Sequence, residues 1–138
     1  MAFRVWPAGW HDDRVRFEKR DGYTLLIGWA LPGASATTFR RLILVRDGRE
    51  DDDHLIRHEL EHVRQWREHG VVGFLVRYVR PYLLWRLRGY PHWGAYRRIP
   101  FEIEAEWLAR RAELKEHVML ASTVRSAAAE SSTLGCQT

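Results

Sequence analysis

The strongest constraint on the fold is a helix predicted over residues 54–69, because residues that start and end helices bound it on both sides. Three aspartates at 51–53 precede the segment. Carboxylates at this position accept hydrogen bonds from free backbone N–H groups and interact favourably with the helix dipole. Gly70 follows the segment, and glycine commonly ends a helix. The rest of the fold has to cover one side of this helix.

Two histidines, His58 and His62, lie four residues apart in this helix, with Glu59 between them. Residues four apart differ by about 40° in direction and about 6 Å in height, so both imidazoles can reach one point. Such a pair binds zinc, and Glu59 is then a candidate general base that accepts a proton from a water on the metal. His54 lies on the same face, but a straight helix cannot wrap three turns around one ion, so we expect it at the surface or beside a ligand.

A catalytic zinc site needs a third protein ligand. The continuation found in metzincins is absent, because glutamine and glutamate occupy the positions where that pattern has glycine and histidine. His92 is possible but lies in a predicted loop. We favour Glu102, which heads a helix predicted from Pro100 to about Leu120, with Glu106 one turn further placed to orient a ligand histidine.

Each of these residues also has a purely structural interpretation. The bare histidine pattern would arise by chance in roughly a few per cent of shuffled chains, and acids near Glu102 suit the first turn of any helix. Tyr96 and His92, which precede that helix, are candidates to donate hydrogen bonds to a developing oxyanion, although packing in a loop is the commoner role. The coincidence of a His-Glu pair with a downstream acidic helix favours the metal interpretation.

The run Phe101-Glu102-Ile103-Glu104-Ala105-Glu106, downstream of His58-Glu59-Leu60-Glu61-His62, resembles the gluzincin metallopeptidases, above all the CAAX-prenyl endopeptidases. It also resembles small uncharacterised bacterial zincin-like proteins. The resemblance covers two helices and implies a zincin-like fold with zinc ligands His58, His62 and Glu102, the base Glu59, and Glu106 in place of an aspartate of the family. The chain departs from the prenyl endopeptidases in lacking predicted membrane spans and in having glutamate at position 106. The resemblance therefore does not predict that this chain acts on their substrates.

The segments around the motif helix predict a small sheet and further helices. Asp21-Gly22 separates two apolar runs, which is a strong hairpin signal. Thr37–Arg46 is predicted as another strand because it contains four consecutive apolar residues. Residues 71–87 have apolar positions at helical spacing, with Pro81 expected to kink or split the helix. Residues 89–96 are predicted as a loop.

These elements predict one α+β domain over residues 1–120, in which a small antiparallel sheet packs on the motif helix and further helices follow. The length of 138 residues and the 46% hydrophobic content suit a single core. Small and polar residues over 121–138 predict a disordered tail. The one cysteine, Cys136, lies in that tail, so neither a disulfide framework nor a thiolate cluster is expected, and a metal would be bound by histidines and carboxylates.

Charge is unevenly distributed in a chain of net charge +4, because residues 71–100 contain six arginines and no acid. Arg77, Arg80 and Arg88 are candidates for contact with an anionic surface. The alternative is a solvated arginine face that covers an apolar helix. Arginines interrupt the longest apolar stretch, so no transmembrane helix is predicted. Residues 1–10 lack a basic segment followed by an apolar run, which predicts no signal peptide and a cytoplasmic location.

The sequence therefore predicts a zinc-dependent hydrolase, specifically a metallopeptidase that acts on a peptide or protein. The strand expected before the motif helix favours such a substrate, because a sheet edge can pair with an extended peptide. The alternative function is a non-catalytic module, in which zinc is structural and the arginine-rich segment binds a membrane or nucleic acid. Glu59 favours the enzyme, since a structural site has no use for a base.

Overall fold

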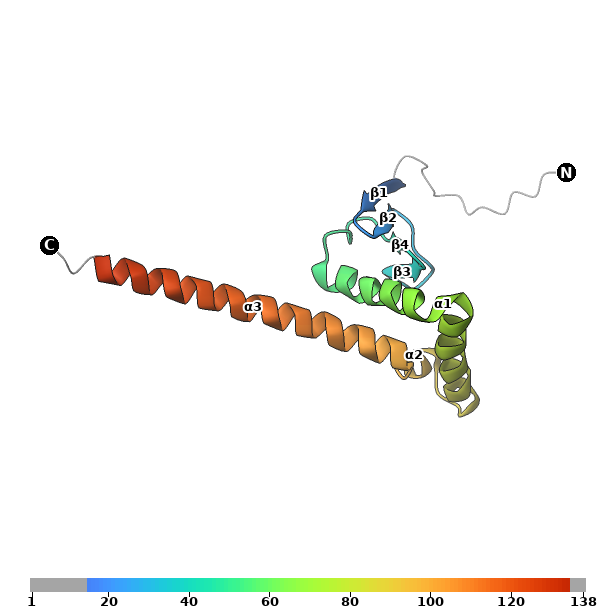
Figure 1. Ribbon diagram of the computed structural model, residues 1–138. Helices are drawn as coiled ribbons and strands as arrows, with labels where there is room; N and C mark the ends of the chain where they lie inside the picture. The colour runs from blue at the N-terminus through green and yellow to red at the C-terminus, as the bar shows by residue number, and fades with distance from the viewer. Residues whose placement is uncertain (1–14, 135–138) are drawn as a thin grey trace.

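The computed structural model describes residues 15–134 and has an α+β architecture, as predicted. Residues 1–10, on which the prediction of no signal peptide depends, lie outside the described residues. Cys136, on which the prediction of no disulfide framework depends, also lies outside them. A four-stranded sheet packs on the first part of the long helix α1, and α3 packs against another side of α1 (Figure 1). The elements in chain order are β1 (Arg16–Arg20), β2 (Tyr23–Ile27), β3 (Ala36–Phe39), β4 (Leu42–Val45), α1 (Asp53–Leu87), α2 (His92–Tyr96) and α3 (Pro100–Leu134).

Two hairpins form the sheet. β1 and β2 pair antiparallel across Asp21-Gly22, as predicted, with Gly22 at a φ of 82°. The second hairpin corrects a prediction, because the single strand expected over Thr37–Arg46 is divided into β3 and β4 by a turn at Arg40-Arg41. Arg40 has a φ of 57°, in the left-handed region that non-glycine residues seldom adopt. No glycine, asparagine or aspartate marks this turn, so the sequence pattern does not reveal it.

The sheet has the strand order β1-β2-β4-β3 and is mixed rather than antiparallel. β2 and β4 pair in parallel, with Leu25 opposite Ile43, so the expected antiparallel arrangement is wrong for this pair. The reason is the path of the chain, which crosses from β2 to the outer edge, forms β3 there and returns as β4 between the two. β3 is therefore an edge strand.

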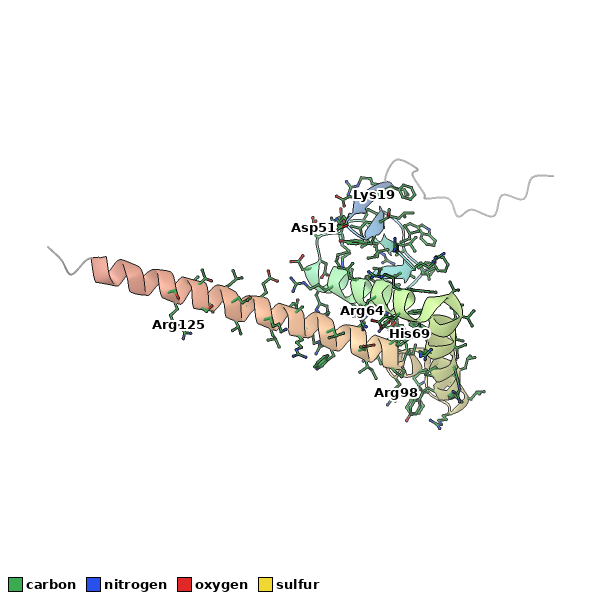
Figure 2. All side chains as sticks on the ribbon, in the orientation of Figure 1. Lys19, Asp51, Arg64, His69, Arg98 and Arg125 are labelled. Atoms are coloured by element: carbon green, nitrogen blue, oxygen red, sulfur yellow. The ribbon has the colours of Figure 1, made fainter. Side chains whose placement is uncertain are left out.

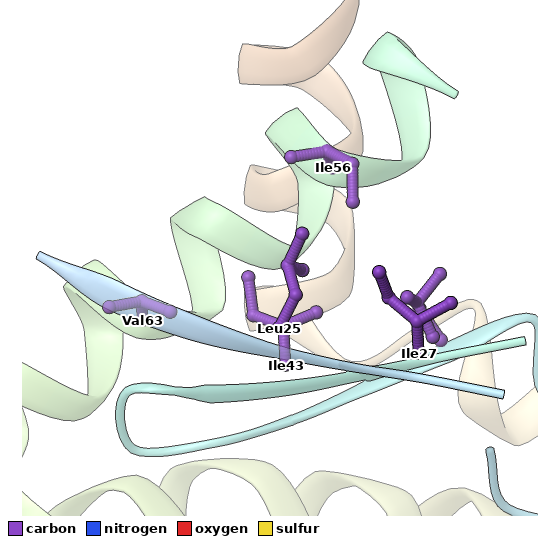
Figure 3. Packing of buried hydrophobic residues seen from close by; sticks show 7 residues of the cluster. Leu25, Ile27, Ile43, Ile56 and Val63 are labelled. Carbon is purple, nitrogen blue, oxygen red and sulfur yellow. The ribbon is translucent and has the colours of Figure 1, made fainter. Parts of the chain in front are cut away.

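The main core lies between the two central strands and the first part of α1. Leu25 and Ile43 are fully buried, and they pack with Ile56 and Val63 from α1 (Figure 3). Alternate residues of a strand point to the same face, so β2 and β4 bury one apolar face each. Burial of one such side chain contributes roughly 1.5–3 kcal/mol. This packing holds the motif helix against the sheet.

α1 consists of two helices joined at Gly70, where the backbone leaves the helical region with φ 65° and ψ −178°. The predicted helix end at Gly70 is confirmed, as is the acidic start, because the Asp52 side chain accepts a hydrogen bond from the backbone N–H of Leu55 at 3.0 Å. Of the kink or split expected at Pro81, the split does not occur, since the second helix continues through Pro81 to the end of α1. Proline removes the donor for the carbonyl of Arg77, and Arg77 is exposed, so water can replace that donor.

The segment after α1 is more ordered than predicted. Residues 92–96 form the short helix α2, although the whole stretch from Gly89 to Tyr96 was expected to be a loop. Pro91 stands immediately before this helix with a φ of −64°, a value that the proline ring favours and that suits the start of a helix. α2 turns the chain toward the start of α3.

α3 begins at Pro100, as predicted, but it does not end near Leu120. The tail that was expected to be disordered from Ala121 is helical up to Leu134, and its alanines have a high helix propensity. This part of α3 projects as a single helix (Figure 1), and the side chain of Arg125 points away from the rest of the molecule (Figure 2). None of the described helices combines the length and the hydropathy of a membrane span.

We predict that Gly70→Ala lowers the free energy of unfolding by about 1–3 kcal/mol, because the backbone conformation of Gly70 is strained for any residue with a side chain. Urea unfolding followed by circular dichroism measures the change. The matched control is Gly73→Ala, inside the second helix, which should change the free energy by less than about 1 kcal/mol. Equal losses in the two variants would show that the bend does not require glycine.

Candidate metal centre

His58, His62 and Glu102 meet where α1 packs on α3. The Nε2 atom of His58 lies 3.2 Å from Nε2 of His62 and 3.2 Å from Oε2 of Glu102. Nε2 of His62 lies 3.3 Å from Oε1 of Glu102. One ligand atom from each residue lies within 4.8 Å of the other two. The structure thus brings together the three residues that the sequence named as ligands.

The two histidines direct the same ring atom to this point because their other nitrogen faces an oxygen. Nδ1 of His62 lies 2.9 Å from the side-chain oxygen of Gln65. Nδ1 of His58 faces a carboxylate oxygen of Glu106 at 3.6 Å. The hydrogen bond to Gln65 keeps the proton on Nδ1 of His62, so that its Nε2 presents a lone pair. Glu106 is too far from Nδ1 of His58 for a hydrogen bond and favours a proton there by its charge alone. Two lone pairs and a carboxylate then share one small space, which is a donor set for a cation.

The charges around Glu102 fit a divalent cation. Burial raises the pKa of this carboxyl, but its contacts with His58 and His62 outweigh burial and hold the pKa well below its usual range. The same contacts act on His62, whose pKa is lowered by burial but raised more strongly by Glu102. The buried carboxylate therefore attracts positive charge to Nε2, where a metal ion would compete with a proton. Two imidazoles with one carboxylate are a ligand set of zinc.

Glu59, the predicted base, lies beside this centre and is not part of the ligand cluster. Its side chain is buried, and the hydroxyl of Thr38 on β3 donates a hydrogen bond to Oε2 at 2.7 Å. Burial raises the pKa of the Glu59 carboxyl, which increases its affinity for a proton. A carboxylate held in one position with a raised pKa suits general base catalysis.

Two tyrosines donate hydrogen bonds to Glu102. Tyr96 reaches Oε2 at 2.6 Å, and Tyr78 reaches Oε1. Burial and the neighbouring carboxylate raise the pKa of both phenols, so both remain protonated donors. Tyr96 was a sequence candidate for an oxyanion donor, whereas Tyr78 was not among the site residues that the sequence indicated. The structure places them together at the ligand carboxylate.

The other candidates lie at the margin of the centre. His92 lies in α2, and its Nδ1 is 3.0 Å from the hydroxyl of Tyr82, so it does not join the three ligand atoms. Glu106 lies between His58 and His54, with an oxygen 3.2 Å from Nε2 of His54. His54 therefore connects the motif helix to α3 beside His58.

Gln65 and Thr38 are site residues that the sequence did not indicate as such. Gln65 is fully buried, and its amide N–H groups donate to the backbone carbonyl of Phe101 and to the carboxylate of Glu104 while its oxygen faces His62. Its position three residues after His62, on the same face of the helix, is the signal that could have revealed it. Thr38 has no such signal, because its contact with Glu59 depends on tertiary packing.

The centre opens into a cavity of about 740 Å³. The walls come from the loop before β3, from β3 itself and from all three helices, and they include His58, Glu59, His62, Tyr78 and Glu102. Small molecules and peptide side chains therefore have space beside the ligand atoms.

Comparisons with protein-family models, curated proteins and solved structures give no match for this chain. The functional interpretation of the centre therefore depends on its own geometry and chemistry.

We predict that the purified protein binds about one zinc ion per chain, and that His58→Ala or His62→Ala abolishes binding. Glu102→Ala should weaken binding much more than its matched control Glu104→Ala, since Glu104 contacts Arg64 and reaches the cluster only indirectly, through Gln65. Metal analysis after chelation and reconstitution, followed by calorimetric titration with zinc, measures both effects. Equal losses in the Glu102 and Glu104 variants would transfer the ligand role to another residue, with His92 the first to test.

Proposed function

We propose that this chain is a zinc-dependent hydrolase of zincin-like organisation that cleaves peptide bonds with water. The observation that carries the proposal is the convergence of three ligand atoms beside a separate, buried glutamate, at the wall of an open cavity. A zinc ion held there would lower the pKa of a bound water toward about 7 and polarise a substrate carbonyl.

Each protein group then has a distinct task. His58, His62 and Glu102 would hold the ion, while Gln65 keeps the His62 ring in its orientation. Glu59 takes the proton from the attacking water and passes it to the leaving amine, as a general base and then a general acid. The hydrogen bond from the Thr38 hydroxyl orients the carboxylate of Glu59 for this transfer.

Tyr78 and Tyr96 are the candidates for stabilising the negative charge that develops on the carbonyl oxygen. Both are protonated phenols at the ligand carboxylate and both line the cavity. Each phenol has a single O–H, which it donates to Glu102 in this structure, so a tyrosine would stabilise the oxyanion after its O–H turns from Glu102 to the substrate oxygen. The pair extends the sequence hypothesis, which had named Tyr96 together with His92.

Two features support a catalytic rather than a structural metal site. Structural zinc sites have four protein ligands and are closed, whereas catalytic sites have three and keep one position open. The described residues supply a cluster of three, next to a cavity. The second feature is the buried carboxylate of Glu59. Burial of a carboxylate costs free energy, and a structural zinc site gains nothing from a buried base beside its ligands.

The edge strand β3 supports a peptide as the substrate. Ala36, Thr37 and Thr38 line the same cavity as the ligands, and Thr38 contacts Glu59. An edge strand offers unpaired backbone groups, and an extended peptide can pair with them. A peptide added to β3 would pass close to the centre, with its carbonyl groups near the base.

The decisive experiment is Glu59→Gln, which retains the shape of the side chain but removes its ability to accept a proton. Zinc content should remain, whereas hydrolysis of a peptide library should fall by about 10²-fold to 10⁴-fold. Glu61→Gln is the matched control in the same helix, because Glu61 pairs with Arg64 instead of facing the centre, and it should retain activity. A chelator should abolish hydrolysis in every active variant.

Two results would contradict the proposal. Equal cleavage of an identified peptide by the wild-type protein and the Glu59 variant would show that Glu59 is not the base. A wild-type protein that binds zinc stoichiometrically and hydrolyses neither peptides nor activated esters would instead favour a structural metal site.

A further inference from the structure

The second helix of α1, residues 71–87, has two sides of different chemistry. Phe74 and Tyr78 point inward and line the metal-centre cavity. The opposite side is apolar and exposed, with Val72 76% and Leu87 84% accessible. It forms a shallow groove of about 480 Å³, lined chiefly by Leu75, Val76, Val79, Leu83, Leu84 and Leu87. An apolar stripe of this extent is typical of a surface that contacts another apolar phase.

Arginines border this apolar stripe. Residues 71–100 contain six arginines and no acid, and all six are exposed. Where their guanidinium groups make hydrogen bonds within the described chain, the acceptors are backbone carbonyls, as for Arg77 with Gly73 and Arg86 with Tyr90. Backbone carbonyls do not neutralise a guanidinium charge, so the segment presents net positive charge beside apolar side chains.

Aromatic side chains complete the surface at the end where α1 meets α2. Trp85 and Tyr90 lie there beside the guanidinium of Arg98. The guanidinium of Arg98 lies 4.3 Å from the ring centre of Tyr90 and 5.4 Å from that of Trp85. Figure 2 shows Arg98 at this end of the molecule, far from the projecting part of α3. Tryptophan and arginine side chains favour the boundary between lipid headgroups and acyl chains.

We propose that the exposed side of residues 71–98 docks on the surface of an anionic phospholipid bilayer. The aliphatic stripe enters the boundary of the acyl chains, and the bordering arginines contact lipid phosphates, as in amphipathic helices that lie in a membrane interface. Nucleic acid would match the arginines but would leave the aliphatic stripe in water. The bilayer matches both features, and the inference does not depend on the proposed hydrolase activity.

Docking in this way leaves the metal centre accessible. The apolar groove and the metal-centre cavity lie on opposite sides of one helical segment, with Val76 and Val79 on the outer side and Phe74 and Tyr78 on the inner side. The bound protein would therefore keep its cavity open beside the membrane, where segments of membrane-associated proteins are available.

The test is co-sedimentation of the full chain with vesicles of phosphatidylcholine and phosphatidylserine, compared with vesicles of phosphatidylcholine alone. Binding should require the anionic lipid and decrease with added salt. The double variant Arg77→Gln/Arg80→Gln should reduce partitioning by about 25-fold, or about fivefold for each arginine. The matched control Arg41→Gln/Arg46→Gln removes the same charge from the sheet and should reduce it less than about twofold.

A second pair of variants tests the apolar contribution. Val76→Gln/Leu83→Gln should reduce partitioning by about tenfold, because each substitution removes an aliphatic group from the interface. Leu114→Gln/Val118→Gln, at exposed positions of α3, should have no effect. Circular dichroism and thermal unfolding establish that every variant is folded.

Three results would overturn the proposal. The first is a wild-type protein that remains in the supernatant with both kinds of vesicle. The second is an equal loss in the sheet control and the Arg77/Arg80 variant. The third is unchanged vesicle binding in the Val76/Leu83 variant together with equally tight binding of duplex DNA, which would assign the surface to polyanions in general.

Discussion

The contact between the buried carboxylate of Glu102 and the imidazoles of His58 and His62 is the interaction on which the rest of the structure depends. A buried carboxylate is costly unless its oxygens are paired, and here each oxygen has a histidine and a tyrosine beside it. These partners come from both parts of α1 and from α2, so one side chain of α3 connects all three helices. The apolar cluster around Trp66 and Phe101 packs against Tyr78 and Tyr96, the two tyrosines that contact Glu102.

This arrangement requires α1 to bend and its first part to be anchored. The bend at Gly70 turns the second helix so that Tyr78 reaches Glu102. The sheet anchors the first helix through apolar contacts to Ile56 and Val63. The same sheet supplies Thr38, whose hydroxyl holds the carboxylate of Glu59. The sheet thus serves the centre in two ways, by supporting the ligand helix and by orienting the neighbouring acid.

Features that depend on local chemistry were predictable from the sequence, whereas those that depend on the path of the chain were not. The helix boundaries at the aspartates and at Gly70, the hairpin at Asp21-Gly22 and the shared direction of His58 and His62 follow from residue preferences and helical spacing. The turn at Arg40-Arg41 lacks a residue that favours it. The parallel pairing of β2 with β4 arises because the chain crosses to the outer edge and forms β3 there before this turn returns it as β4.

Glu102 shows how far sequence reasoning reaches into the site itself. The number of residues between Glu102 and the His58–His62 motif does not indicate whether they are close in space. Glu102 was predicted as a ligand because it lies at a helix start and because the segment resembles a known family. Its tyrosine partners were harder to identify, because an aromatic ring at helical spacing is equally suited to a core and to a polar contact. The structure shows that Tyr78 has both roles, since its ring packs on Phe74 and its hydroxyl donates a hydrogen bond to the carboxylate of Glu102.

The two sides of residues 71–87 explain why periodicity alone gave an incomplete account of this segment. Phe74, Leu75, Tyr78 and Val79 form one apolar pattern in the sequence, but the aromatic members face the metal centre and the aliphatic members face outward. Aromatic residues with hydroxyl groups can pack and donate hydrogen bonds at once, whereas exposed aliphatic residues beside arginines have no comparable partner within the described chain. Because the two groups lie on opposite sides, substitutions on the outer side leave the contacts of Glu102 intact. The proposed chemistry of the centre can therefore be tested separately from the proposed attachment of the protein to a membrane surface.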